Sequence, residues 1–98
     1  MIQPAGAKYL RELVRATALR PPIVLNLFAL IRALMGPGAV PQQLKECLAV
    51  RTSVLNGCDY CLASHSALAR RHGATDAQLD AVARGDATVF PDAWRPAF

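Results

Sequence analysis

Four side chains within one short stretch of the sequence have the types and spacing of a thiol redox site. Two cysteines lie three residues apart, a histidine follows the second cysteine by four residues, and a glutamate precedes the first cysteine by twelve: Cys58, Cys61, His65 and Glu46. A Cys-x-x-Cys pair can close into a disulfide and reopen, so it can carry two electrons. No other part of the chain has a pattern that predicts chemistry.

The spacing of the two cysteines from the histidine distinguishes their roles. If Cys58 begins a helix, the unpaired amide groups of the first turn favour a thiolate, which is the reactive form of cysteine. His65 follows Cys61 by one helical turn, so their side chains can meet. Cys58 lies two turns from His65, roughly 10 Å along the axis. The spacing therefore nominates Cys61 as the thiol that His65 deprotonates, with Cys58 as its disulfide partner.

Glu46 is far enough from the cysteines in sequence to lie on a separate helix that faces them. At helical spacing it shares one face with Ala49, Val50 and Ser53. Small residues on that face permit close approach of a neighbouring helix, so we expect Glu46 to be semi-buried. A carboxylate in such a place needs a hydrogen-bond partner. We expect His65 to be that partner and Glu46 to orient its imidazole, as in other activated nucleophiles.

Prolines and glycines divide the chain into helical blocks that position these residues. We expect helices over residues 5–19, 21–35, 41–55, 58–73 and 75–84, with a sixth element starting at Pro91. Thr75 is the expected N-cap of the fifth helix. No segment alternates with a period of two for long enough to form a strand. The predicted fold is all-α, a compact bundle of five to six helices with the Cys-x-x-Cys at the N-terminus of a helix.

The composition predicts a single domain over residues 1–98 that associates with copies of itself. The chain has 98 residues, of which 53% are hydrophobic and only 6% aromatic. A few short helices cannot hide that much apolar surface alone. The net charge of +4 comes from basic residues scattered along the chain, and no nucleic-acid motif appears. The strongest apolar run, residues 23–31, is too short to span a bilayer, so neither nucleic acid nor membrane is an expected partner.

The cysteine count indicates a reducing compartment. Three cysteines, an odd number, do not make the disulfide framework of a secreted protein. The N-terminus has the pattern of an amphipathic helix rather than of a secretory signal. We therefore expect a cytoplasmic protein, in which the third cysteine, Cys47, is a buried small apolar residue.

The pattern Glu-x11-Cys-x2-Cys-x3-His, between an apolar helix and a glycine-capped one, resembles the alkyl hydroperoxidase D-like members of the carboxymuconolactone decarboxylase superfamily. The resemblance is specific over residues 41–85 and weaker over residues 21–35. It implies an all-helical homo-oligomer, a trimer or hexamer, that needs no metal or organic cofactor. It also implies a peroxidase that reduces hydroperoxides with electrons from an external thiol, such as a lipoyl-type or thioredoxin-like dithiol.

The resemblance also implies a role for each residue of the site. In the hydroperoxidases, the second cysteine attacks the peroxide and becomes a sulfenic acid, and the first cysteine closes the disulfide. Carried over, these roles fall to Cys61 and Cys58. The proton relay of the hydroperoxidases falls to Glu46 and His65.

Two departures from the hydroperoxidases bear on this expectation. Tyr60 stands where they have a histidine just before the second cysteine, which puts efficient peroxide turnover in question. The chain also ends at Phe98 where many relatives continue into further helices, so it is either a minimal member or part of a longer one. The lactone decarboxylases of the superfamily lack the Cys-x-x-Cys, so we do not expect their activity.

Two other functions fit the same residues. The cysteines can serve a dithiol–disulfide relay or redox sensor without significant peroxidase turnover. The four site residues are also acceptable zinc ligands, as in a non-enzymatic zinc-stabilised helical oligomer. Three of the four lie along one helical stripe, however, which encloses a tetrahedral ion poorly. A peroxidase is therefore the main prediction.

Overall fold

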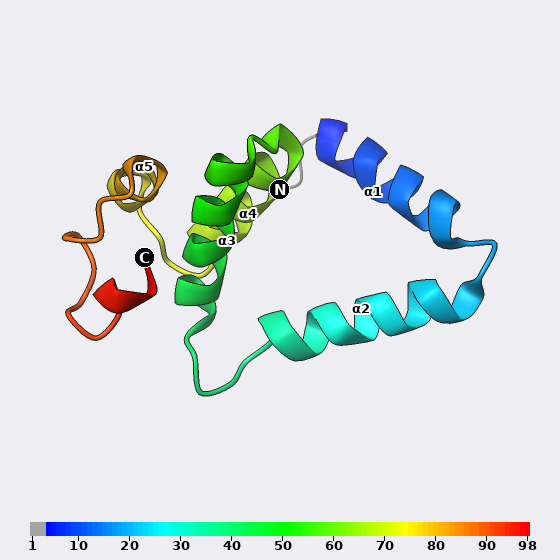
Figure 1. Cartoon of the computed structure of the whole chain (residues 1–98), viewed down its shortest axis with the longest axis horizontal. Coiled ribbons are helices and arrows are strands. Elements are labelled where there is room, and N and C mark those ends of the chain that lie inside the picture. Colours follow the sequence, from blue (N-terminus) through cyan, green and yellow to red (C-terminus); the bar gives the residue numbers. More distant parts are fainter. Residues whose placement is uncertain (1–3) are drawn as a thin grey trace.

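The computed structural model of the chain describes residues 4–98, with side chains from Leu10 onward. Within that range there is no strand, and the chain forms five α-helices and one short 3-10 helix (Figure 1). The elements are α1 (Pro4–Thr17), α2 (Pro21–Met35), α3 (Gln42–Asn56), α4 (Asp59–Arg71), α5 (Asp76–Arg84) and η1 (Arg95–Ala97). The all-α prediction is confirmed, and the expected sixth element is a single 3-10 turn.

The helices begin and end within two residues of the limits that the sequence predicts, and the caps show why. Proline occupies the first positions of α2, where a missing amide hydrogen costs nothing. At the start of α5, the Thr75 hydroxyl accepts from the Gln78 amide at 3.2 Å, and the Gln78 side chain accepts from the Thr75 amide at 2.9 Å. This reciprocal pair is a capping box and confirms Thr75 as the N-cap.

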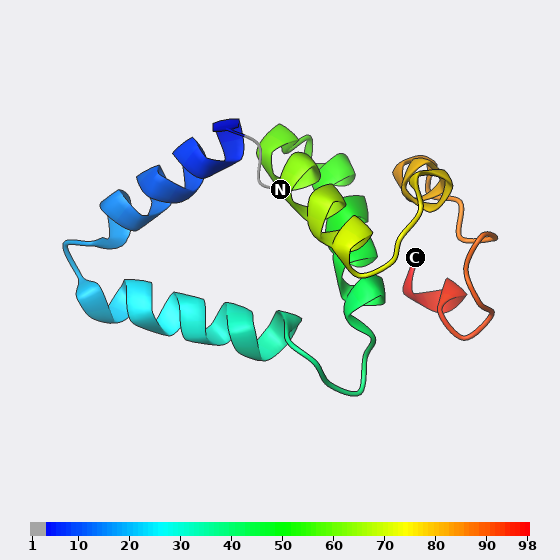
Figure 2. The same cartoon turned by 180° about the vertical axis from the view of Figure 1, so that it is seen from behind.

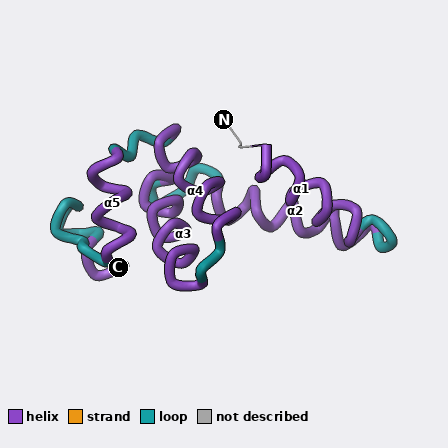
Figure 3. The backbone as a smooth tube through the Cα atoms, turned by 90° about the horizontal axis from the view of Figure 1, so that it is seen from above, coloured by secondary structure: helices purple, strands orange, loops and turns teal. Residues whose placement is uncertain are grey.

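The hydrophobic core lies in the second half of the chain, where α3 packs against both α4 and α5. Figure 3 shows α3 and α4 in the middle of the molecule, with α5 and the C-terminal segment on one side. The buried core residues are Cys47, Val50, Ala69, Ala74, Leu79, Val82 and Phe90. Phe90 stacks on Phe98 with ring centroids 4.8 Å apart, which folds the C-terminal segment back onto this core. We call residues 41–98 the body.

Helices α1 and α2 form a hairpin that extends away from the body (Figures 1 and 2). We call residues 4–40 the arm. None of the α2 residues is buried. The extension gives the chain a radius of gyration of 14.5 Å, larger than the roughly 13 Å of a compact domain of this length. The compact bundle is therefore the body, and none of the arm side chains that the structure describes, residues 10–40, is buried. None of the helices formed by residues 4–98 has both the length and the apolar character needed to cross a membrane.

Candidate redox site

The turn between α3 and α4 fixes the position of Cys58. Gly57 has a left-handed backbone conformation, with φ of 65°. Its amide donates to the Val54 carbonyl at 3.1 Å, and the Cys58 amide donates to the Ser53 carbonyl at 3.0 Å. These two bonds are those of a Schellman motif, which satisfies the last carbonyls of α3. Because Cys58 ends this motif and is also the N-cap of α4, both helices hold its backbone.

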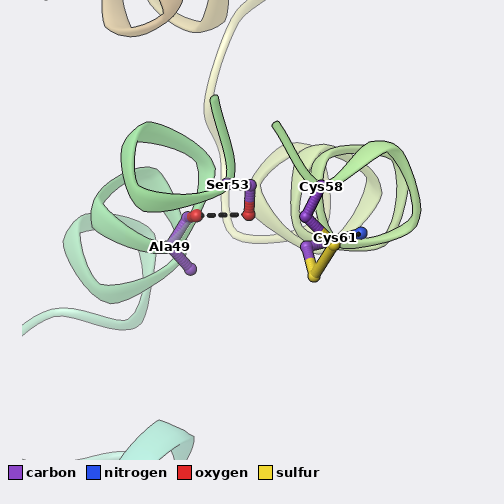
Figure 4. Close-up of a disulfide and its surroundings, with 4 residues drawn as sticks. All are labelled: Ala49, Ser53, Cys58 and Cys61. Atoms are coloured by element: carbon purple, nitrogen blue, oxygen red, sulfur yellow. Dashed lines mark hydrogen bonds between the residues drawn. A yellow bond between two sulfur atoms is a disulfide. The ribbon is translucent and has the colours of Figure 1, made fainter. Parts of the chain in front are cut away.

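The two cysteines of the Cys-x-x-Cys lie together at the start of α4, joined as a disulfide (Figure 4). Their Cα atoms are 5.3 Å apart, within the range that a disulfide bridges without backbone movement. The Cys58 sulfur accepts a hydrogen bond from the Cys61 amide at 3.2 Å. The sulfur of Cys58 therefore takes the place that a serine or aspartate oxygen takes at most helix N-termini. An amide in this position also stabilises a thiolate when the disulfide is opened.

Replacing Gly57 by alanine should lower the thermal stability of the protein. A side chain at φ of 65° strains the backbone, and a left-handed residue costs roughly 1–2 kcal/mol. No atom lies within 4 Å of the added Cβ, so the effect is conformational rather than steric. We expect a fall in Tm of roughly 5–10 °C for a domain of this size, measured by circular dichroism.

Gly38→Ala is the matched control for this substitution. Gly38 does not have a positive φ, and the nearest atom to its added Cβ is Lys45 Nζ at 3.8 Å. We expect its Tm to match that of the wild type. Equal falls in Tm for both variants would contradict the role given to the left-handed turn.

Glu46 and His65 form a close pair between α3 and α4. Nδ1 of His65 lies 2.7 Å from Oε2 of Glu46. The Glu46 side chain is only 5% exposed, and that of His65 is 32% exposed. In the tautomer whose Nδ1 carries the proton, Nδ1 donates to an ionised Glu46 carboxylate, which can only accept, and Nε2 is the accepting nitrogen. That tautomer leaves the Nε2 lone pair as the site that accepts a proton from a thiol or a substrate.

The four candidate residues thus form two pairs that are separated by one turn of α4. A disulfide joins Cys58 to Cys61, and a hydrogen bond joins Glu46 to His65. His65 follows Cys61 by four residues on the same helix, which brings their side chains to the same face. Glu46 is more deeply buried than the semi-buried position expected from the sequence, because α3 and α4 pack closely at its small residues.

Figure 4 draws Ser53 of α3 together with the disulfide, and its backbone carbonyl accepts from the Cys58 amide. Its hydroxyl donates to the Ala49 carbonyl at 2.6 Å, and its side chain is buried. The sequence marked Ser53 only as a small residue on the Glu46 face. The sequence predicts that α3 ends at Asn56–Gly57. It does not predict that the backbone at this helix end, through Ser53 and Gly57, also holds Cys58.

Cys47 lies apart from this site although it adjoins Glu46 in the sequence. It is a free cysteine and fully buried in the core, as expected. Burial raises the pKa of the Cys47 thiol, and the neighbouring Glu46 carboxylate raises it further. A neutral, inaccessible thiol reacts poorly with electrophiles and oxidants.

The folded, reduced protein should therefore titrate two thiols quickly and the third only on unfolding. Cys58 and Cys61 are partly exposed, whereas Cys47 has no accessible surface. Because the pKa of Cys47 is raised, a pH near 8 should not activate it. The measurement is a thiol-reactive chromophore at pH 8, with and without denaturant. Cys47→Ala should keep both fast thiols and lose the slow one; three fast thiols in the wild type would contradict the buried position.

The arrangement gives the zinc alternative no support. Among residues 10–98, no three histidine, cysteine or acidic side chains converge closely enough to hold a metal ion. Glu46 bonds to one nitrogen of His65, and the two sulfurs bond to each other.

The fold and site define an all-α protein with a Cys-x-x-Cys pair at the start of a helix. The sequence pattern of the carboxymuconolactone decarboxylase family matches residues 21–95. The chain belongs to this family, which includes alkylhydroperoxidase-like enzymes.

One relative is an uncharacterized protein of Cupriavidus necator, 37% identical over 59 residues. The match covers 59% of this chain and 52% of the relative, so the chain spans about half the length of that protein. No solved structure matches the chain.

Proposed function

We propose that the protein is an alkyl hydroperoxidase D-like, thiol-dependent peroxidase that reduces hydroperoxides through Cys58 and Cys61. The observation that carries the proposal is the pairing of Glu46 with His65 one helical turn from Cys61. A disulfide alone can be structural. A disulfide beside an imidazole whose Nδ1 is held by a buried carboxylate has the parts of an activated nucleophile.

The first half of the proposed cycle oxidises Cys61. His65 Nε2 accepts the Cys61 proton, and the thiolate attacks the terminal oxygen of the hydroperoxide. The O–O bond breaks, the alcohol leaves with the proton that His65 returns, and Cys61 becomes a sulfenic acid. Glu46 holds Nδ1 protonated throughout and stabilises the imidazolium that forms in between.

The second half of the cycle closes and reopens the disulfide. The Cys58 thiolate attacks the Cys61 sulfur, water leaves with the Cys58 proton, and the Cys58–Cys61 bond forms. An external dithiol then reduces this bond and becomes oxidised itself. The sum is one hydroperoxide and one dithiol converted to one alcohol, one water and one disulfide. A lipoyl-type or thioredoxin-like dithiol is the proposed reductant.

A dithiol–disulfide relay or redox sensor is the second candidate function, and Tyr60 favours it. Tyr60 precedes Cys61 on α4 and is half-buried, where the hydroperoxidases have a histidine. A phenol does not exchange protons at neutral pH as readily as an imidazole does. Such a protein uses the same disulfide but turns over peroxide negligibly.

Peroxide consumption by the purified protein, with excess dithiol, tests the proposal. Organic hydroperoxide and hydrogen peroxide are supplied separately, and free thiols are counted before and after one equivalent of oxidant. Catalytic consumption with the loss of two thiols supports the peroxidase. Loss of two thiols without turnover overturns it in favour of the relay. Thiols that react only after a chelator is added overturn it in favour of the zinc-stabilised oligomer.

A further inference from the structure

Helix α2 and its flanks expose more large apolar side chains than any other part of the described chain. Seven of them, all between residues 19 and 40, are 41–91% exposed. Contiguous exposed apolar surface of this kind marks interaction sites more often than ordinary solvent-facing surface. The arm therefore has the apolar surface of a protein interface, and no α2 residue is buried by the part of the chain that the structure describes.

Four of the α2 residues form a regular seam. Ile23, Leu27, Leu30 and Leu34 are spaced by four, three and four residues, the a/d spacing of a coiled coil. At 100° per residue they fall within a strip about 60° wide. Ile23, Leu30 and Leu34 are each about half exposed, and Leu27 is half-buried. This spacing fits the side chains of a second helix better than it fits a flat surface.

The residues beside the seam are small enough to allow a second helix to approach closely. Asn26, Ala29 and Ala33 lie along one edge of the strip. Two of them are small, and the Asn26 amide already donates to the Pro22 carbonyl at 2.7 Å. One N–H of the Asn26 amide is therefore satisfied within α2, and the rest of the amide stays at the edge of the seam, where water reaches it.

The charge of α2 favours a second copy over a membrane. Its single charged residue is Arg32, which lies almost opposite the seam together with Leu25. Two seams can therefore meet without bringing like charges together. Helices that lie in a membrane surface carry a strongly charged polar face, which α2 lacks.

We propose that α2 pairs antiparallel with α2 of a second copy along the seam of Ile23, Leu27, Leu30 and Leu34. The antiparallel arrangement is self-complementary, as a two-fold interface requires, and it aligns opposite ends of the two helix dipoles. The proposal specifies one interface of the homo-oligomer expected from the sequence. It does not depend on the chemistry of the cysteines.

The proposed pairing of α2 is also linked to the body, through the start of α3. The last carbonyls of α2 are bonded to the first turn of α3: Gln42 Nε2 donates to the Met35 carbonyl at 3.3 Å, and Lys45 Nζ donates to the Gly36 carbonyl at 2.9 Å. Lys45 adjoins Glu46. Two hydrogen bonds therefore connect an interface along α2 to the helix that carries Glu46.

The test is the mass of the particle for seam variants of the full chain. Multi-angle light scattering and sedimentation equilibrium should give a multiple of 10.5 kDa for the wild type. Leu30→Glu and Leu34→Glu should weaken association at least about 100-fold, because each places a charge in the desolvated apolar seam. Leu34→Ala, which adds no charge, should weaken it less.

Leu25→Glu is the matched control on the same helix. Leu25 is 69% exposed, more than either seam residue, but lies on the opposite face. It should retain the wild-type mass, and circular dichroism should show unchanged helix content in all variants. A monomeric wild type at 100 µM overturns the proposal. Dissociation by Leu25→Glu to the same extent as by the seam variants also overturns it. A monomeric protein that sediments with anionic phosphatidylglycerol vesicles, and no longer does so when Leu30 is replaced, overturns it as well. Peroxide consumption is measured separately, so failure of the interface and failure of the peroxidase remain distinguishable.

Discussion

Cys61→Ser is expected to abolish peroxide consumption, whereas Cys58→Ser should retain the first chemical step and lose turnover. A serine hydroxyl stays protonated and is a poor nucleophile, so the first variant cannot attack the peroxide. The second variant keeps Cys61 one turn from His65 and should form a sulfenic acid that no cysteine of the chain resolves. Turnover with excess dithiol should fall at least about 100-fold for Cys61→Ser. A carbon nucleophile that traps sulfenic acid, read by mass spectrometry after one equivalent of peroxide, separates the two variants.

Both variants are best made in a Cys47→Ala background. Cys47 is fully buried, so its removal should not alter the reaction, and it leaves a single cysteine in each variant. Trapping on Cys61 alone supports the assigned roles. Trapping on Cys58 in the Cys61→Ser variant would reverse them, because the helix N-terminus would then activate the first cysteine more than His65 activates the second. No trapping on either residue would remove the peroxidase proposal.

The parts of this site that the sequence predicts correctly all depend on local rules. Glycine ends helices and proline begins them through backbone geometry that requires no distant contact. The limits of α3, α4 and α5 can therefore be predicted from the sequence to within two residues. The i, i+4 relation of Cys61 to His65 follows from helix geometry alone. The approach of α3 to α4 could also be anticipated, because small residues surround Glu46 and permit it.

The parts that the sequence does not reveal depend on long-range packing or on an unusual residue in a common role. A sulfur as the N-cap of α4 was not expected, since side-chain oxygens dominate that position. The stacking of Phe90 on Phe98 brings together residues from a segment with no periodic pattern. The arm could not be foreseen either, because an apolar helix has the same sequence whether it packs in its own core or against another chain.

The substitutions Glu46→Gln and Glu46→Ala should lower peroxide reduction to different extents. Glutamine keeps an oxygen that can accept from Nδ1 of His65 but lacks the charge that stabilises the imidazolium, so we expect a loss of about 10-fold. Alanine removes both, and we expect about 100-fold or more, approaching His65→Asn. The measurement is kcat/KM for hydroperoxide at saturating dithiol. Partial retention by glutamine is expected of a residue that acts through the imidazole.

The double variant Glu46→Ala/His65→Asn decides whether the pair works as a unit. Because Glu46 contacts His65 and acts through it, removing both should be no worse than removing His65 alone. Independent roles would instead multiply the two losses. A purely structural role for Glu46 makes a different prediction. In the reduced Glu46→Ala variant, the oxidant diamide would close the Cys58–Cys61 disulfide more slowly than in the wild type. We expect that rate to be preserved within about threefold, because the turn at Gly57 and the N-cap of α4 hold the two cysteines without help from Glu46.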